Sequence, residues 1–403
     1  MDSSTLFDVA IAGAGPAGTS AAIRLALKGA RVLLIEEKKF PRAKLCGEFI
    51  SPECLTHFQQ LGVLEQMVSV GGTSLSETVF YSARGRQVAV PSEWFTSGGT
   101  ALGLSRSEMD HRLLERAKAV GVKVLEDAHA TDLIFKDGLV GGVKVRTSAG
   151  ANDHRARLTI DATGRSRALA RHFDGPHHGR SGKQKRSMVA FKAHLENAHL
   201  APGTCEIYFY AGGYGGLSEI EQGLSNLCFI VAADQVRRLG SDPDRVLREI
   251  VMRNLRAAKT LEEARLHSSW LSVSLEGFGR KTLTPANGLL TIGDAASFID
   301  PFTGSGMLMA LESGEVVAGT IIRRLGLPWD SQAFQLIAKE YENEYTKRFA
   351  SRLRVSGILR RAAFVPYLAD MAIHFFSGSA RLRRKLARAT RHANSHEAPA
   401  SFS

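Results

Sequence analysis

Three glycines near the start of the chain have the spacing of a phosphate-binding turn. Gly13-x-Gly15-x-x-Gly18 separates an apolar run from an Ala/Leu-rich segment in "LFDVAIAGAGPAGTSAAIRLALKGARVLLIEE". In a β-α-β unit, the first glycine permits the tight turn, the second lets the backbone approach a pyrophosphate, and the third lets the helix pack on the strand. The helix N-terminus then holds the phosphates. This pattern predicts dinucleotide binding, with Ala17 inside the turn as a further contact.

An acidic residue at the end of the second strand of such a unit binds a ribose hydroxyl. The second apolar run here ends in Glu36 and Glu37. Glu36 comes first and is the main candidate, while Glu37 is either the second candidate or a solvated side chain.

Two cysteines follow this unit in "PRAKLCGEFISPEC", residues 41–54, where seven residues separate Cys46 from Cys54. That separation disfavours a redox-active disulfide, and no Cys-x-x-Cys or paired histidine motif indicates a metal site. Cys54 is expected to begin a helix. The chain has only four cysteines, the others being Cys205 and Cys228, which is too few for a disulfide-stapled scaffold and fits a reducing compartment.

Two later segments carry further signatures. "IDATGRSR" (160–167) contains Asp161 and Gly164, and "TIGDAASFIDPFTGSGMLMALESG" (291–314) contains Gly293-Asp294 and the helix-opening pair Gly304 and Gly306. With the glycine turn, they resemble, in the right order, the signatures of the flavoprotein group related to p-hydroxybenzoate hydroxylase. The resemblance implies FAD as cofactor, bound through these residues, and a glutathione-reductase-type nucleotide fold.

Within that group, "FPRAKLCGEFISP" resembles the geranylgeranyl reductase-like branch, in which Lys-x-Cys-Gly is typical. The resemblance covers roughly residues 5–325. It implies that Cys46 approaches the isoalloxazine and that Gly47 allows close backbone contact. It also implies that Arg42 or Lys44 faces phosphate or reductant, and that Arg106 in "LSRSEMD" contacts the pyrophosphate. Cys46 then either tunes flavin reactivity or substrate protonation, or is a small buried side chain without chemistry.

The sequence departs from the family where a substrate marker is expected. "GGYGGLSEIEQG" keeps Tyr214, a candidate catalytic residue, but has Gly216 and Ser218 in place of the Trp and Pro of the reductase and halogenase motifs. Halogenation is therefore disfavoured. No second glycine fingerprint follows a strand, so NAD(P)H is expected to bind only transiently at the flavin, unless electrons come from another protein.

The expected fold is α/β: an FAD-binding Rossmann domain with an inserted antiparallel-sheet (α+β) substrate domain and C-terminal helices. The first part of the FAD-binding domain covers 1–170, with a hairpin excursion at 75–95. The substrate domain covers 171–282, with strands at 188–195, 205–210 and 227–232 and a helix at 242–257. The FAD-binding domain resumes over 283–330, and helices and a basic tail occupy 331–403.

The net charge of +12 is concentrated near the C-terminus, where twelve Lys and Arg and a single acid lie between Lys347 and Arg391. Together with the apolar block 362–376, these charges either dock on an anionic membrane surface or form a solvated face of helices that cap the core. No recognition motif indicates nucleic acid. With no membrane-spanning stretch and no signal peptide pattern, a cytoplasmic or peripheral membrane protein is expected.

Three functions remain open. The first is an FAD-dependent reductase of C=C bonds in an isoprenoid or similar hydrophobic small-molecule substrate, with the proton coming from Cys46, Tyr214 or water. The second is an NAD(P)H-dependent flavin monooxygenase that hydroxylates an aromatic or polyketide substrate. The third is a non-enzymatic flavin-binding protein at a membrane surface, for which only the basic tail argues.

Overall fold

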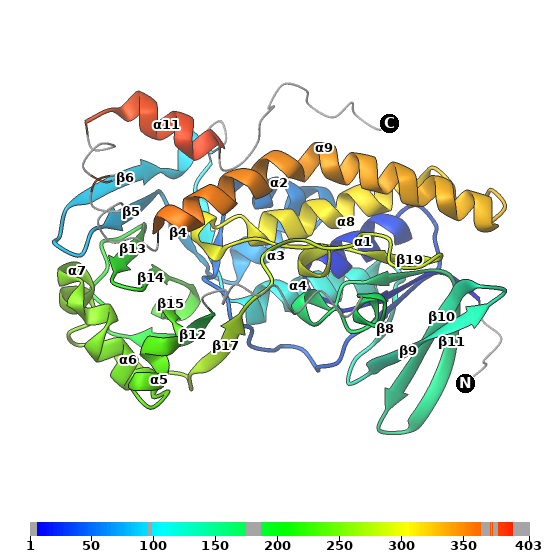
Figure 1. The fold of residues 1–403 in the computed structure, drawn as a ribbon, viewed down its shortest axis with the longest axis horizontal. Helices are drawn as coiled ribbons and strands as arrows, with labels where there is room; N and C mark the ends of the chain where they lie inside the picture. The colour runs from blue at the N-terminus through cyan, green and yellow to red at the C-terminus, as the bar shows by residue number, and fades with distance from the viewer. Residues whose placement is uncertain are drawn as a thin grey trace.

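The computed structural model describes residues 6–95, 99–174, 187–363, 371, 373 and 378–389. Two large sheets lie along the long axis of the molecule, and a layer of helices covers them (Figure 1). Most of the apolar block at 362–376 and the chain after residue 389 lie outside the described residues.

The first sheet has seven strands and contains the predicted β-α-β unit. Its parallel part has the order β8-β2-β1-β11-β19, and β10 and β9 extend it in antiparallel fashion. All four residues of β2 are buried, as expected for a parallel strand that is covered on both faces. The bounds are β1 Phe7–Ala12, β2 Val32–Ile35, β8 Lys123–Leu125, β9 His129–Lys136, β10 Leu139–Thr147, β11 Gly150–Asp161 and β19 Leu289–Thr291.

The second sheet has eight strands, mostly antiparallel, in the order β16-β12-β15-β14-β13-β5-β6, with β17 also paired to β12. The expected hairpin at 75–95 forms as β5 and β6, and β5 pairs in parallel with β13, so the hairpin is the edge of this sheet. The bounds are β5 Glu77–Tyr81, β6 Gln87–Pro91, β12 Met188–Glu196, β13 Thr204–Tyr210, β14 Gly213–Glu219, β15 Ser225–Ala232, β16 Arg265–Leu266 and β17 Leu271–Leu275.

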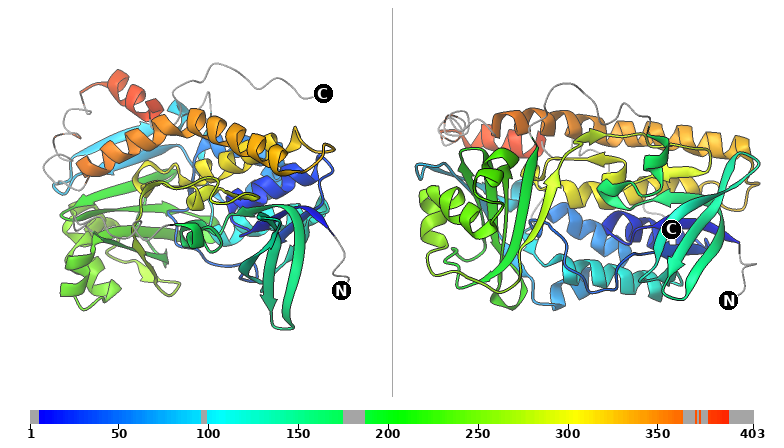
Figure 2. Two further views of the ribbon diagram at one scale, coloured as in Figure 1. Left: turned by 45° about the vertical axis from the view of Figure 1, so that its right-hand side comes forward. Right: turned by 60° about the horizontal axis from the view of Figure 1, so that its bottom comes forward.

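Helices pack on both sheets and position the ends of the parallel strands. Helix α1 (Pro16–Ala26) packs on α8 (Gly306–Ile322), and α9 (Ser331–Ala363) lies over α8 and extends along one side of the molecule (Figure 2). Helix α4 (Arg106–Ala119) has Ser105 as its N-cap, because the Ser105 hydroxyl accepts a hydrogen bond from the amide of Glu108. Helix α11 (Ala380–Ala389) contacts β6.

The remaining elements are short. The small strands form a three-stranded sheet, β3-β7-β4, and a pair, β18-β20. Their bounds are β3 Phe49–Ile50, β4 Thr73–Leu75, β7 Ala101–Gly103, β18 Gly279–Arg280 and β20 Ser297–Phe298; the other helices are α2 Pro52–Leu61, α3 Leu64–Ser69, α5 Ala233–Arg238, α6 Pro243–Glu249 and α7 Leu255–Thr260.

Two local expectations differ from the structure. The helix predicted at 242–257 is divided into α6 and α7, because the Asn254 side chain accepts hydrogen bonds from the amides of Arg256 and Ala257 and starts a new helix. Strand β14 was not predicted, since its glycines weaken the strand pattern. In the sheet, a Cβ at Gly215 would lie only 2.9 Å from the Cβ of Phe229, so the close packing requires glycine there.

No helix in the described part of the chain is both long and apolar enough to cross a bilayer.

Candidate functional site

One large cavity of about 1050 Å³ joins the carboxyl ends of the parallel strands to the face of the antiparallel sheet. Fifteen of the predicted site residues line it: Gly13, Gly15, Ala17, Glu36, Glu37, Arg42, Cys46, Gly47, Arg106, Gly164, Tyr214, Gly293, Asp294, Gly304 and Gly306. Gly18 and Asp161 are not among the lining residues. Residues predicted from six separate sequence segments therefore meet at one site.

The glycine turn has the steric features that its spacing predicts. A Cβ at Gly18 would collide with the carbonyl oxygen of Gly13, so this glycine serves helix–strand packing and not contact with the cavity. A Cβ at Gly15 would meet nothing within 4 Å, which leaves the backbone open to a close ligand. Helix α1 has no side-chain cap, and its N-terminal amides are a favourable place for phosphate.

Glu36 and Glu37 have different environments. The Glu36 carboxylate is buried, and it accepts a hydrogen bond of 2.9 Å from the amide of Ala14 and one of 3.3 Å from Nε of Arg42. The Glu37 side chain is 60% exposed and lies 3.8 Å from the ring of His129. Glu36 is thus fixed beside the glycine turn, as a ribose-binding acid requires, whereas Glu37 fits the solvated alternative.

Arg42 and Arg106 share one buried acid, Asp110 on α4. Arg106 makes bonds of 2.9 and 2.6 Å to the two oxygens of Asp110, and Arg42 makes one of 3.1 Å. Burial opposes the charge of Arg106, but Asp110 and the nearby Cys46 thiol outweigh it and raise the pKa of the guanidinium above its ordinary value. Asp110 therefore holds Arg106 toward Cys46, and contact with a pyrophosphate stays a prediction for this arginine.

The third predicted segment lies where β19 ends and α8 begins. Gly293 and Asp294 lie in a short 3-10 turn after β19, and Gly304 and Gly306 precede and open α8. Burial raises the pKa of Asp294, although the charges of Arg165, Arg106 and Lys44 act in the opposite direction. Asp294 is thus an acceptor on the cavity wall, surrounded by cations that suit an anionic ligand.

Asp161 shapes the neighbouring turn from outside the cavity. One carboxylate oxygen accepts from the amide and hydroxyl of Thr163, at 3.0 and 2.6 Å, and the other from the amides of Leu169 and Ala170, at 3.0 and 2.8 Å. These four bonds hold Gly164 at the cavity. The predicted cofactor contact of Asp161 is therefore indirect in this geometry.

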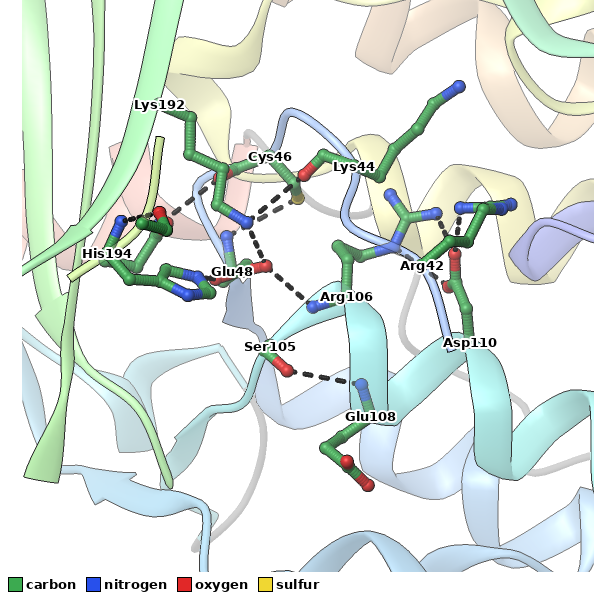
Figure 3. Close-up of polar contacts among 12 residues, drawn as sticks. Arg42, Lys44, Cys46, Glu48, Ser105, Arg106, Glu108, Asp110, Lys192 and His194 are labelled. Atoms are coloured by element: carbon green, nitrogen blue, oxygen red, sulfur yellow. Dashed lines mark hydrogen bonds and ion pairs between the residues drawn. The ribbon is translucent and has the colours of Figure 1, made fainter. Parts of the chain in front are cut away.

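Cys46 lies on the cavity wall in a loop that is hydrogen-bonded to the antiparallel sheet (Figure 3). Its Sγ accepts a hydrogen bond of 3.4 Å from the amide of Glu48, and its carbonyl accepts one of 3.2 Å from Asn226 on β15. Glu48 is fully buried and bonds to Lys192 and His194 of β12. None of the four cysteines, Cys46, Cys54, Cys205 and Cys228, all in the described part of the chain, forms a disulfide, and Cys54 lies at the start of α2 as expected.

The cluster of Glu48, Lys192 and His194 was not found from the sequence. Glu48 is more than 140 residues from the other two members, and no motif connects it to them. One signal was present: Lys192 and His194 are two residues apart in a strand that is otherwise apolar before Glu196, so their side chains share one face. Two basic groups on one face of a buried strand indicate an acidic partner.

The other end of the cavity is apolar and belongs to the antiparallel sheet. Aromatic and aliphatic side chains line it: Phe80, Val88, Val90, Ile207, Phe209, Ile230, Val273, Leu275, Phe298 and Phe302. Arg383 of α11 also lines the cavity; its Nη1 donates to the carbonyl of Ala89, and its guanidinium lies 5.7 Å from the centroid of the Trp94 ring. This end suits an apolar chain next to Arg383.

The ring of Tyr214 lines the same region, but its hydroxyl points elsewhere. It donates a hydrogen bond of 2.8 Å to Oδ1 of Asp300, which is buried and is not a lining residue of the cavity. Burial and the Asp300 charge raise the pKa of Tyr214 well above its ordinary value, so the phenol stays protonated at neutral pH. Burial also raises the pKa of Cys205 and of Cys228, each to about 12, so both lining thiols stay neutral.

Comparisons with known proteins agree with this site. A family model described as an FAD binding domain matches residues 6–343. The chain is 27% identical over 361 residues to digeranylgeranylglycerophospholipid reductase 2 of Methanopyrus kandleri, covering 87% of this chain and 86% of that protein.

Two solved structures share the fold. One is a geranylgeranyl bacteriochlorophyll reductase-like protein from Thermoplasma acidophilum, with a TM-score of 0.76, 20% identity, and coverage of 94% of this chain and 95% of that one. The other is a triple mutant of the flavin-dependent brominase Bmp2, with a TM-score of 0.77, 19% identity, and coverage of 96% of both chains. At these identities the likeness concerns the fold alone.

Proposed function

This chain belongs to the FAD binding domain family and is an FAD-dependent oxidoreductase, and from that premise we propose that it is of the geranylgeranyl reductase type and reduces C=C bonds in an isoprenoid lipid. One observation carries the proposal: the cavity continues from the predicted cofactor residues into an end lined by aliphatic and aromatic side chains. A relative whose name specifies a prenylated phospholipid supports this class of substrate.

The residues that would hold FAD fit its chemistry. The α1 N-terminus and the open backbone at Gly15 suit the pyrophosphate, Glu36 suits a ribose hydroxyl, and Gly304 and Gly306 bring the start of α8 to the cavity. When reduced, FAD supplies a hydride. NAD(P)H that binds transiently, or an electron-donor protein, is proposed as the source of electrons.

The apolar end of the cavity would bind the prenyl chain and exclude water from it. Burial of apolar chain surface is favourable by about 25 cal/mol per Å². Arg383 would pair with an acidic group on the same lipid, because it is a cation at this otherwise apolar end.

Reduction of a C=C bond adds one hydride and one proton. We assign the proton to Cys46, because this thiol lies on the cavity wall and the guanidinium of Arg106 beside it would stabilise the thiolate that remains. Solvent then returns the proton to Sγ. Tyr214 is the second candidate, although its hydroxyl would first have to leave Asp300.

We propose that α11 is the element that contacts the membrane from which the lipid substrate would be taken. Arg348 and Arg352 of the basic tail bond to Glu312, which is buried, and so do not form a free basic face. Arg381, Arg384 and Lys385 on α11 are exposed. These three charges suit the surface of an anionic membrane.

The proposal is tested by reducing the FAD-loaded protein without oxygen and mixing it with a geranylgeranylated phospholipid in detergent micelles. The proposal expects reoxidation of the cofactor that depends on this lipid and does not occur with its saturated analogue. Reoxidation only by oxygen, together with hydroxylation of an aromatic substrate, would favour the monooxygenase alternative. A cofactor that stays oxidised with NADH, NADPH and dithionite would favour a non-enzymatic flavin-binding protein.

A further inference from the structure

Glu48 has a backbone conformation that a residue with a side chain seldom adopts. Its φ is +52°, in the left-handed region, and its side chain is fully buried. A non-glycine residue in this region is strained, and the surrounding contacts must hold it there. The strain lies one residue from Gly47 and two from Cys46, both on the cavity wall.

The side-chain contacts that hold Glu48 come from two separate elements, α4 and β12 (Figure 3). Oε1 accepts a bond of 2.7 Å from the backbone amide of Arg106 at the start of α4 and one of 2.5 Å from Nζ of Lys192 on β12. Oε2 is 2.7 Å from Nε2 of His194, also on β12. The carboxylate therefore joins the Cys46 loop to α4 and to the antiparallel sheet.

The same loop is held at two further points. Nζ of Lys192 donates to the carbonyl of Lys44 at 3.3 Å, and Asn226 of β15 donates to the carbonyl of Cys46 at 3.2 Å. Sγ of Cys46 accepts from the amide of Glu48 itself. Every one of these bonds fixes the backbone on either side of the thiol.

Glu48 is charged in this setting. Burial opposes its ionisation, but the hydrogen bond from His194 and the charge of Lys192 outweigh burial and lower its pKa below the ordinary value. Lys192 is itself only 2% exposed, so the two form a buried pair, and removal of one partner would leave the other charge uncompensated.

We propose that Glu48 is a positioning residue whose carboxylate, held by Lys192, His194 and the Arg106 amide, fixes Cys46 and Gly47 at the cavity and couples them to the substrate sheet. The effect on turnover rests on the proposed function. The effect on the thiol does not, because it concerns only the position of the loop.

Stability and positioning are separated by a pair of variants. Glu48→Gln leaves Lys192 as an uncompensated buried cation, whereas the double variant Glu48→Gln/Lys192→Met removes both charges and so restores much of the stability. Neither variant keeps the ion pair between Glu48 and Lys192. A matched control is Glu312→Gln, because Glu312 is also a buried acid bonded to a buried arginine, Arg352, but bonds α8 to α9 away from the Cys46 loop.

The experiment measures alkylation of Cys46 by iodoacetamide in the FAD-loaded full chain, followed by mass spectrometry of the peptide, together with the melting temperature. Turnover is then measured per bound FAD. The proposal expects the alkylation rate in the double variant to differ from wild type by about fivefold or more, and turnover to fall about tenfold, while Glu312→Gln changes neither by more than about twofold.

Alkylation and turnover in the double variant that match those of Glu312→Gln would overturn the proposal, whatever the melting temperatures are, because Glu48 would then act only on stability. If the wild-type protein turns over no prenyl lipid, the proposed function fails, and the alkylation rates alone still decide the role of Glu48.

Discussion

Tyr214→Phe separates a role in stability from a role in proton transfer. The variant removes the hydroxyl that donates a bond of 2.8 Å to Asp300 and keeps the ring. A hydrogen bond to a charged group contributes about 1.5–3 kcal/mol to stability, and Phe fills the same space, so no cavity term is added. We therefore expect the free energy of unfolding to fall by about 1.5–3 kcal/mol.

Turnover should change little in the same variant. The hydroxyl is bonded to Asp300, which does not line the cavity, so we expect kcat to stay within about threefold of wild type, whereas loss of a general acid costs about 10²–10⁴-fold. Urea unfolding of the FAD-loaded protein, followed by circular dichroism, measures the first effect, and steady-state kinetics the second. Asp300→Asn is the control, because it keeps an acceptor without the charge and should lose less stability. A hundredfold fall in kcat with wild-type stability would refute this reasoning and make Tyr214 the proton donor.

Three further predictions use other parts of the site. Gly18→Ala should prevent stable folding, because the added Cβ would collide with the Gly13 carbonyl. Gly15→Ala should fold normally but bind FAD more weakly, which the release of FAD during dialysis measures. Equal melting temperatures of the two variants would contradict this prediction. Burial raises the pKa of Tyr208, Tyr210 and Tyr214 in the folded state. The stability that their protonated phenols contribute is therefore complete below the ordinary pKa of about 10 and is lost as the pH rises further. The melting temperature should fall above about pH 10, and a melting temperature that does not change with pH in this range would count against the prediction. Arg383→Met should raise KM for a prenyl phosphate about tenfold and leave KM for the neutral prenyl alcohol unchanged. Arg384→Met, on the exposed side of α11, is the control and should alter neither KM. Equal effects of Arg383→Met on both substrates would exclude an ion pair between Arg383 and the acidic group of the lipid.

The β-α-β unit and its glycine turn were predictable because the information is local. Gly13, Gly15 and Gly18 lie within six residues. At Gly18 the close packing excludes a Cβ, and at Gly15 the backbone is open to a ligand. Glu36 could be ranked above Glu37 only by its place at the strand end, and burial now distinguishes them. Asp161 shows the limit of such reasoning, because a motif aspartate can serve the turn and not the ligand.

The substrate half was less predictable because its contacts are distant in sequence. Strand β5, which begins at Glu77, pairs with β13, which begins at Thr204, and no local sequence pattern specifies this pairing. The bond between Glu48 and Lys192 spans 144 residues. Strand β14 escaped detection because the tight packing that requires its glycines also removes the alternating pattern by which strands are recognised.

The central claim, that a prenyl C=C bond is reduced in this cavity, is tested most directly by the origin of the two hydrogens in the product. The reduced FAD-loaded protein is mixed without oxygen with a geranylgeranylated phospholipid in D₂O, and the product is examined by mass spectrometry and NMR. Because the transferable hydrogen of reduced FAD and the Cys46 thiol both exchange with solvent, each reduced bond formed in D₂O should carry two deuterium atoms, and a Cys46→Ser variant is measured in parallel. The account predicts a saturated bond in wild-type product and a large loss of rate in Cys46→Ser. An unreduced lipid with oxidation of the cofactor only after oxygen is admitted would contradict it.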